Sequence, residues 1–201
     1  MKLSSYLDPA LIFVNIEAQT KDEAITTLIE RAAVVDPVFA QLKPAITTAV
    51  LEREHGVSTA IGHGIAVPHA RVEGYNDVIV VIGVLQRAIQ CELATKEQGE
   101  MQVIFLVVVG KTRNQLMLQL MAGLMKLAEH RDVFSNILRK PDPEDIYAQV
   151  RKAGIQLKKD FLAGDLMNTE LQPARLDNTL DSTSRSPLKS LHTSKNFLAF
   201  S

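Results

Sequence analysis

The sequence predicts an α/β fold in which helices cover both faces of a sheet. Two segments, residues 78–84 and 103–109, are almost unbroken runs of β-branched and other apolar residues. Such runs are typical of strands that are buried on both faces. Segments with the apolar spacing of amphipathic helices precede and follow them, so strands and helices alternate along the chain. A hydrophobic fraction of 46% in 201 residues is enough for a packed core.

Local signals place one strand and one long helix at the start of the chain. The apolar run at residues 11–16 predicts a strand. Thr20 and Glu23 have the spacing of a capping box, in which the Thr20 side chain accepts from the first helical turn and Glu23 reaches back. The helix that follows is expected to run to about Val34, because its apolar residues recur on one face.

Two prolines then predict helix starts, because proline fits the first turn of a helix, where its missing N–H costs nothing. Asp36-Pro37 predicts a short turn of helix, and Pro44 predicts a helix that ends near Arg53. Residues 57–61 predict a short extended segment after this helix.

The second half of the expected domain continues the alternation of strands and helices. Between the two apolar runs, residues 86–102 are polar and predict mostly loop, with a short edge strand near Ile89. The methionines in the long helix that follows are expected to fill the core. The helices predicted after the last strand are one that opens at residues 110–112, one at 132–139 and one at 141–153.

The segment from Gly62 to His69 combines residues that make a rigid strand end. Gly62 and Gly64 permit positive φ angles or a close backbone approach. Residues 65–67 are too few for a helix and predict a short buried strand. Pro68 donates no amide hydrogen bond and should end that strand. His69 is therefore expected at the rim of the core, held firmly and able to reach solvent.

These residues carry a resemblance to a known family. Glu54, six further residues and then Ile61-Gly62-x-x-Ile65-Ala66-Val67-Pro68-His69 resemble the signature of the mannitol/fructose-type (type 2) IIA proteins of the bacterial phosphotransferase system. That group includes a nitrogen-regulatory branch. The resemblance covers about residues 1–152 and implies a three-layer α/β/α sandwich with a mixed sheet. It also implies that His69 accepts a phosphoryl group through Nε2, with no cofactor.

The implied chemistry suggests further site residues. Neutral imidazole is a suitable phosphoryl acceptor, because its ordinary pKa of about 6.5 leaves it largely deprotonated in the cell. Negative charge on the transferring phosphoryl group requires positive charge and N–H donors nearby. Arg53 is the candidate for that charge, if it is not simply a solvated helix end. Thr59 is either a phosphoryl contact or an ordinary strand residue, and His63 and the amides of residues 62–64 are further candidates.

One position departs from the family pattern. Members commonly carry a second histidine near the start of the long helix after the last core strand, where it helps to orient the site. Gln115 stands at that position in this chain. Its amide can still donate a hydrogen bond without changing the charge. Arg113, close by, is an alternative source of positive charge.

The resemblance leaves two function classes open. In the first, His69 receives a phosphoryl group from a histidine-containing phosphocarrier protein and passes it to a IIB component. In the second, the chain is a regulatory binding module, and the phosphorylation state of His69 controls a protein partner. A third interpretation, a metal hydrolase that uses His55, His63 and His69, lacks acidic residues at the spacing of familiar zinc sites. No serine hydrolase, dinucleotide or P-loop motif is found.

Composition narrows the expected location and domain organisation. A formal net charge of −1 gives no general attraction to nucleic acid or anionic lipid. The longest apolar run is far too short to cross a bilayer, the N-terminus lacks a signal-peptide region, and Cys91 is alone. A cytoplasmic protein without membrane insertion is therefore expected. Residues 1–152 should form the IIA-type domain, and residues 153–201 a partly helical and then flexible Ser/Thr-rich tail.

Overall fold

The computed structural model describes residues 1–139 and 142–157 of the chain. They belong to one compact unit, Met1–Leu157. The expected tail lies outside the described residues from position 158 onward. The elements are, in chain order, η1 (Leu3–Tyr6), η2 (Pro9–Leu11), β1 (Ile12–Ile16), α1 (Lys21–Val35), α2 (Pro37–Gln41), α3 (Lys43–Gly56), β2 (Ala60–Gly62), β3 (Gly64–Ala66), β4 (His69–Val72), β5 (Val78–Glu92), β6 (Gln98–Gly110), α4 (Asn114–Glu129), α5 (Arg131–Arg139) and α6 (Pro143–Ala153).

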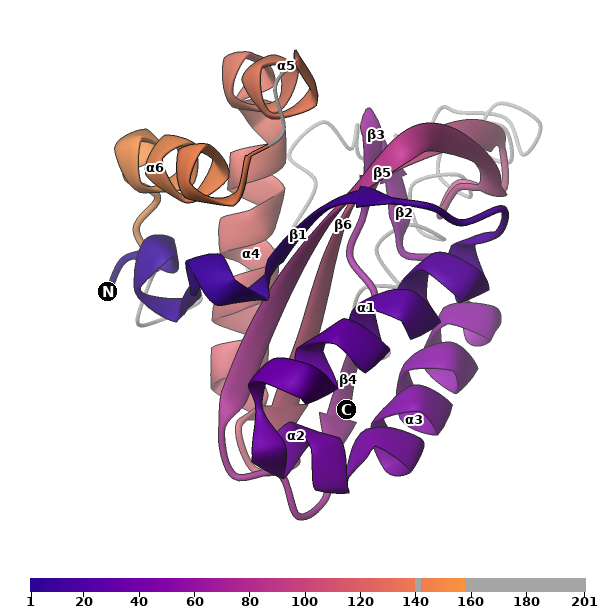
Figure 1. The fold of residues 1–201 in the computed structure, drawn as a ribbon, viewed down its shortest axis with the longest axis vertical. Helices are drawn as coiled ribbons and strands as arrows, with labels where there is room; N and C mark the ends of the chain where they lie inside the picture. The colour runs from indigo at the N-terminus through magenta and orange to yellow at the C-terminus, as the bar shows by residue number, and fades with distance from the viewer. Residues whose placement is uncertain (140–141, 158–201) are drawn as a thin grey trace, which may run out of the picture. The chain divides into compact units, whose positions relative to one another are not determined.

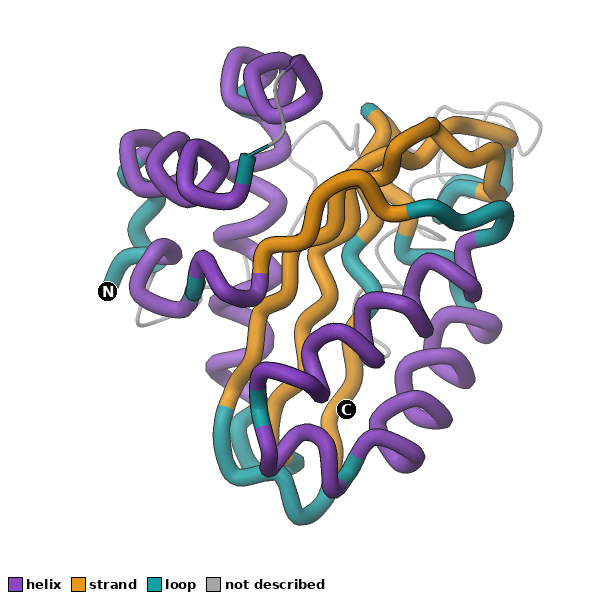
Figure 2. The backbone as a smooth tube through the Cα atoms, in the orientation of Figure 1, coloured by secondary structure: helices purple, strands orange, loops and turns teal. Residues whose placement is uncertain are grey.

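The strands form one mixed sheet, as expected. Its order is β1-β5-β6-β3-β2, and β4 pairs with β6 in addition. The pairs β1–β5, β3–β6 and β4–β6 are parallel, whereas β5–β6 and β2–β3 are antiparallel. The long strands β5 and β6 run side by side through the middle of the molecule (Figures 1 and 2).

The residues of β6 alternate between two cores, which confirms the predicted three-layer α/β/α sandwich. Phe105 and Val107 face one core, which α4, α5 and α6 complete. Leu106 and Val108 face the other, which α1, α2 and α3 complete. Because successive side chains of a strand point to opposite faces, a fully apolar run needs cover on both sides. Figure 1 shows α1 and α3 on one side of the sheet and α4 on the other.

The helix starts follow the local signals in the sequence. Thr20 Oγ1 accepts a hydrogen bond from the Glu23 amide at 3.2 Å, and the Glu23 carboxylate accepts one from the Gln19 amide at 2.8 Å. Asp36 caps α2 through the amides of its first turn. The third helix, α3, extends three residues beyond the expected end at Arg53, to Gly56.

The prediction of mostly loop for residues 86–102 is wrong. β5 continues to Glu92 and β6 begins at Gln98, and the two extensions pair as an antiparallel hairpin with Ile89 opposite Met101. Ile89 and Cys91 are buried while Gln90 and Glu92 are exposed. This alternation is typical of a strand with one solvent-exposed face. The polar composition of the segment as a whole obscured the alternation.

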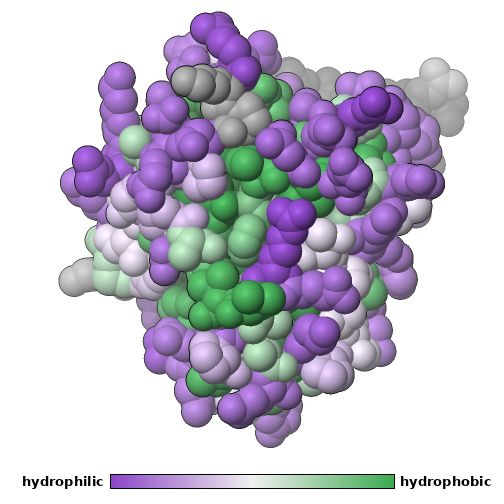
Figure 3. All heavy atoms as spheres, viewed as in Figure 1, coloured by the Kyte–Doolittle hydropathy of each residue, from purple (hydrophilic) through white to green (hydrophobic). Residues whose placement is uncertain are grey.

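Val34, Val35 and Val38 are exposed around the junction of α1 and α2, and Figure 3 shows hydrophobic surface on that face of the molecule. In the described part of the chain, no helix combines the length and the apolar character needed to cross a membrane.

Candidate functional site

The short strand before Pro68, β3, ends at Ala66 as predicted, and a new strand, β4, begins at His69. β3 and β4 lie one after the other along the same neighbour, with Ile65 beside Val103 and His69 beside Val107. The Pro68 carbonyl accepts a hydrogen bond from the Val107 amide at 3.0 Å. Pro68 lacks an amide hydrogen, so it occupies a break in the strand, and pairing resumes at His69.

His69 is buried, contrary to the expectation that it reaches solvent. Its exposed fraction is 3%, and its Nε2 atom is buried as well. The side chain shares a face of the sheet with Val107, in the core that α4 covers. Its Nδ1 lies 2.8 Å from the Val67 carbonyl oxygen. Because a carbonyl only accepts, Nδ1 carries the proton and Nε2 keeps its lone pair.

The surroundings keep this imidazole neutral. Burial lowers the pKa of His69 to about 4, and the positive charges of Arg53 and Arg71 act in the same direction. The hydrogen bond to Val67 and the negative charge of Glu54 oppose this lowering of the pKa. A neutral ring with a fixed tautomer and a lone pair on Nε2 is chemically a nucleophile.

The stability of the fold should therefore fall as the pH drops from about 6.5 to about 4. The unfolded chain binds a proton at His69 near its ordinary pKa of 6.5, whereas the folded chain resists protonation until about pH 4. Acid in this range thus favours the unfolded state, by up to about 1.4 kcal/mol per pH unit from this group. Urea unfolding of wild type and His69→Gln across this range measures the effect. An equal loss in both proteins would contradict the assignment.

The end of α3 places Arg53 near His69. This helix packs beside β4. Arg53 is half-buried, and its Nη1 donates to the Val57 carbonyl at 2.9 Å. Its charge contributes to the lowered pKa of His69. The structure thus brings these two predicted site residues together.

Glu54 is a buried carboxylate that the sequence analysis did not place in the site. Its exposed fraction is 3%. It accepts hydrogen bonds from the Thr59 amide at 2.9 Å and the Thr59 hydroxyl at 2.6 Å, and Lys21 Nζ lies 2.6 Å from its Oε1. In this conformation the Thr59 hydroxyl hydrogen is directed at Glu54. The spacing of Ile46, Val50 and Glu54 by four residues was the available signal, because it puts Glu54 on the buried face of α3.

The start of α4 is tied to the strand of His69. Arg71 Nη1 donates to Asn114 Oδ1 at 2.7 Å. Arg71 follows His69 by two residues in β4, so both side chains lie on one face of the sheet. Gln115 is the next residue of α4 and is exposed. Arg113, the suggested alternative cation, instead donates from Nε to the Asn76 carbonyl at 3.1 Å. Arg71 was not among the predicted site residues, although its spacing of two residues from His69 predicts that both side chains lie on the same face of the sheet.

His63 lies at the other end of this part of the sheet. It occupies the turn between β2 and β3 with φ 54°, flanked by Gly62 and Gly64 at φ 88° and 77°. Gly64 is beside Met101, whereas His69 is beside Val107, six residues further along β6. Six residues of strand span about 20 Å. The structure therefore does not bring His63, or the amides of residues 62–64, to His69.

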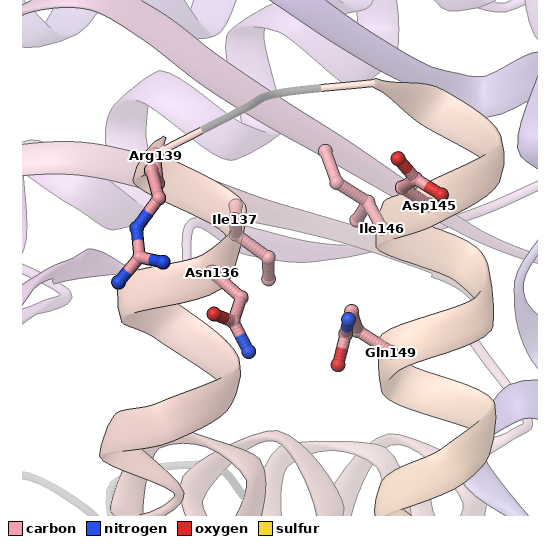
Figure 4. Close-up of a pocket in the computed structure, with 6 residues that line it drawn as sticks. All are labelled: Asn136, Ile137, Arg139, Asp145, Ile146 and Gln149. Carbon is pink, nitrogen blue, oxygen red and sulfur yellow. The ribbon is translucent and has the colours of Figure 1, made fainter.

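Two other kinds of site were considered among the described residues, a metal centre and a pocket. The described residues contain no cluster of three His, Cys, Asp or Glu side chains that could hold a metal ion. His55 instead pairs with Asp22 at 2.6 Å. A pocket of about 260 Å³ lies between α5 and α6 and includes none of the residues discussed above (Figure 4). Its lining residues are Asn136, Ile137, Arg139, Asp145, Ile146 and Gln149.

Comparison with known proteins gives a family match over most of the chain. The model of the family described as "Phosphoenolpyruvate-dependent sugar phosphotransferase system, EIIA 2" matches residues 5–153. A "PTS system mannitol-specific EIICBA component" of Pasteurella multocida (strain Pm70) is 29% identical over 140 residues, which is 70% of this chain and 22% of that protein. A "Nitrogen regulatory protein" of Bradyrhizobium diazoefficiens is 22% identical over 148 residues, which is 74% of this chain and 94% of that protein.

A solved structure supports the same fold. The IIA chain in a complex of enzyme IIAMTL and phosphorylated enzyme IIBMTL from Escherichia coli matches with a TM-score of 0.58 and 19% identity. The match covers 73% of this chain and 97% of that one. At this identity the likeness concerns the fold alone. The mixed sheet flanked by helices is thus common to both chains.

Proposed function

Because this chain belongs to the EIIA 2 family of the phosphoenolpyruvate-dependent sugar phosphotransferase system, we propose that it carries a phosphoryl group on Nε2 of His69. The observation that supports this best is the 2.8 Å contact between His69 Nδ1 and the Val67 carbonyl oxygen. It leaves the lone pair on Nε2, the nitrogen that must attack. Members of the family act in phosphotransfer, so the proposal concerns which atom does so here.

The transfer exchanges one nitrogen–phosphorus bond for another. The Nε2 lone pair attacks phosphorus, the bond between phosphorus and the donor histidine breaks, and its electron pair returns to the donor ring. Negative charge is spread over the phosphoryl oxygens during this step. Arg53 and Arg71 supply the nearby positive charge, and Gln115 orients the site from α4. Since Nε2 is buried in this conformation, transfer also requires a movement that exposes it to the donor.

Direct mapping of the phosphoryl group tests this proposal. The full chain is incubated with phosphoenolpyruvate, enzyme I and a histidine phosphocarrier protein, then digested under alkaline conditions that preserve phosphohistidine. Mass spectrometry should locate one phosphoryl group on the peptide that contains His69. Nuclear magnetic resonance of the intact protein should assign it to Nε2. A phosphoryl group on another residue, or none with an active donor, would refute the proposal.

The partner of the phosphorylated chain is either a IIB component that accepts the phosphoryl group or a protein that the phosphorylation state regulates. The Escherichia coli IIA chain of similar fold was solved with phosphorylated IIB, which supports the first choice. The nitrogen regulatory relative, 94% of which this chain covers, supports the second. Adding a mannitol-type IIB protein to the phosphorylated chain separates them. Rapid loss of the phosphoryl group to IIB supports transport, whereas retention supports regulation. Both roles place the protein in the cytoplasm, with the histidine phosphocarrier protein as donor.

A further inference from the structure

Resting on the proposed function, we propose that Glu54 is a positioning residue for the acceptor histidine. It acts through Thr59 and Val67 and is itself held by Lys21. Glu54 helps to fix the position of the Val67 carbonyl, which accepts the Nδ1 hydrogen of His69. The lone pair of Nε2 then faces the incoming phosphoryl group.

A continuous series of hydrogen bonds connects the carboxylate to the imidazole. The Thr59 amide donates to Glu54 at 2.9 Å. The Val67 amide donates to the Thr59 carbonyl at 3.1 Å. His69 Nδ1 then donates to the Val67 carbonyl at 2.8 Å. Each bond restrains the residue that makes the next one, so the carboxylate acts together with the pairing of β3 and β6 to fix the Val67 carbonyl.

Lys21 holds the carboxylate together with Thr59, and Lys21 is itself held by a further hydrogen bond. Lys21 Nζ, from the first turn of α1, lies 2.6 Å from Glu54 Oε1 and donates to Ser58 Oγ at 2.8 Å. Ser58 Oγ donates in turn to the Glu92 carbonyl on β5, at 2.6 Å. This arrangement satisfies both carboxylate oxygens, which a buried charge requires. It also couples α1, α3 and the hairpin of β5 to the segment before His69.

The negative charge of Glu54 also favours the proposed phosphoryl transfer. When Nε2 attacks phosphorus, positive charge develops on the imidazole ring. Glu54 is a negative charge that favours the positive form of His69, because it raises the pKa of that residue against the effect of burial. Glutamine at this position would lose this contribution, and because it has one acceptor oxygen in place of two, it could not accept from both the Thr59 amide and the Thr59 hydroxyl.

The test compares Glu54→Gln with Glu52→Gln, which removes the same charge from an exposed position of the same helix. Two quantities are measured in folded protein: the proton distribution between Nδ1 and Nε2 of His69, from ¹⁵N chemical shifts, and the rate of phosphoryl uptake from the phosphorylated donor. For Glu54→Gln we expect proton density to move from Nδ1 toward Nε2 and uptake to slow about tenfold, as when a partner that orients a histidine is lost. Glu52→Gln should match wild type in both.

Glu54→Gln with an unchanged tautomer would overturn the proposal, whatever its rate or stability. If that variant does not fold, Thr59→Val replaces it, because it keeps the Thr59 amide and removes only the hydroxyl bond to Glu54. A smaller shift of the tautomer is then expected. Slower uptake by Thr59→Val with an unchanged tautomer would mean that Thr59 contacts the phosphoryl group directly. If wild type took up no phosphoryl group and Glu54→Gln still shifted the tautomer, the positioning role would be supported and the carrier function refuted.

Discussion

The His69→Gln protein is expected to take up no phosphoryl group from a phosphorylated donor, whereas the wild-type chain becomes fully labelled. Glutamine has the approximate size of histidine, but its amide nitrogen has no lone pair available for attack on phosphorus. His55, His63 and His130 are exposed, and none has the placement on β4 that His69 has. Acid-labile label on the intact protein, quantified by mass spectrometry, measures the effect.

A matched variant separates loss of the acceptor from loss of the fold. His63→Gln makes the same chemical change at the exposed turn between β2 and β3, about 20 Å away along the sheet. It should be labelled like wild type, and both variants should keep the circular dichroism spectrum of the folded protein. Label on His69→Gln would place the acceptor elsewhere. Loss of label from His63→Gln would mean that the turn reaches the site during transfer.

The parts of the fold that the sequence predicted are those that short stretches of chain determine. The capping of α1 by Thr20 and the start of α2 at Asp36 depend on side chains within a few residues of the backbone they bind. The apolar run at 103–109 had to be covered on both faces, so the three layers followed from it. These features can be predicted without knowing which residues distant in the sequence are in contact.

The errors concern contacts between distant segments. The hairpin of β5 and β6 was missed because its polar residues face solvent, while the pairing of Ile89 with Met101 is visible only in the folded chain. His63 was proposed for the site because it sits between two glycines of the signature. The extended path along β6 instead separates His63 from His69, and an extended segment places neighbours in sequence far apart in space.

The candidate site was likewise predicted only in part. His69 and Arg53 were predicted, and the structure places them near each other. The burial of His69 was not predicted, because it depends on how segments distant in the sequence pack around β4. Glu54 was interpreted only as the first residue of the family signature. Its contact with Lys21 joins two helices that are far apart in the chain, so no local pattern indicates a buried ion pair.

Gly110→Ala should destabilise the fold by about 3 kcal/mol, since overpacking against a rigid neighbour costs this much. A Cβ at this position would lie 2.2 Å from the carbonyl oxygen of Tyr75. That oxygen belongs to the backbone, so no side-chain rotation relieves the overlap. Gly110 also pairs with Val72 and donates to the Asp77 carbonyl at 3.1 Å, which limits how far β6 can move. Thermal unfolding should show a midpoint lowered by about 10 °C.

The same substitution at Gly56 shows whether backbone crowding is the cause. Gly56 is the last residue of α3, and a Cβ there would meet nothing within 4 Å. Gly56→Ala should therefore be neutral or raise the stability by about 0.5 kcal/mol, because alanine has less freedom to lose on folding. If Gly110→Ala were as stable as Gly56→Ala, the loop that contains Tyr75 would have to yield at little cost.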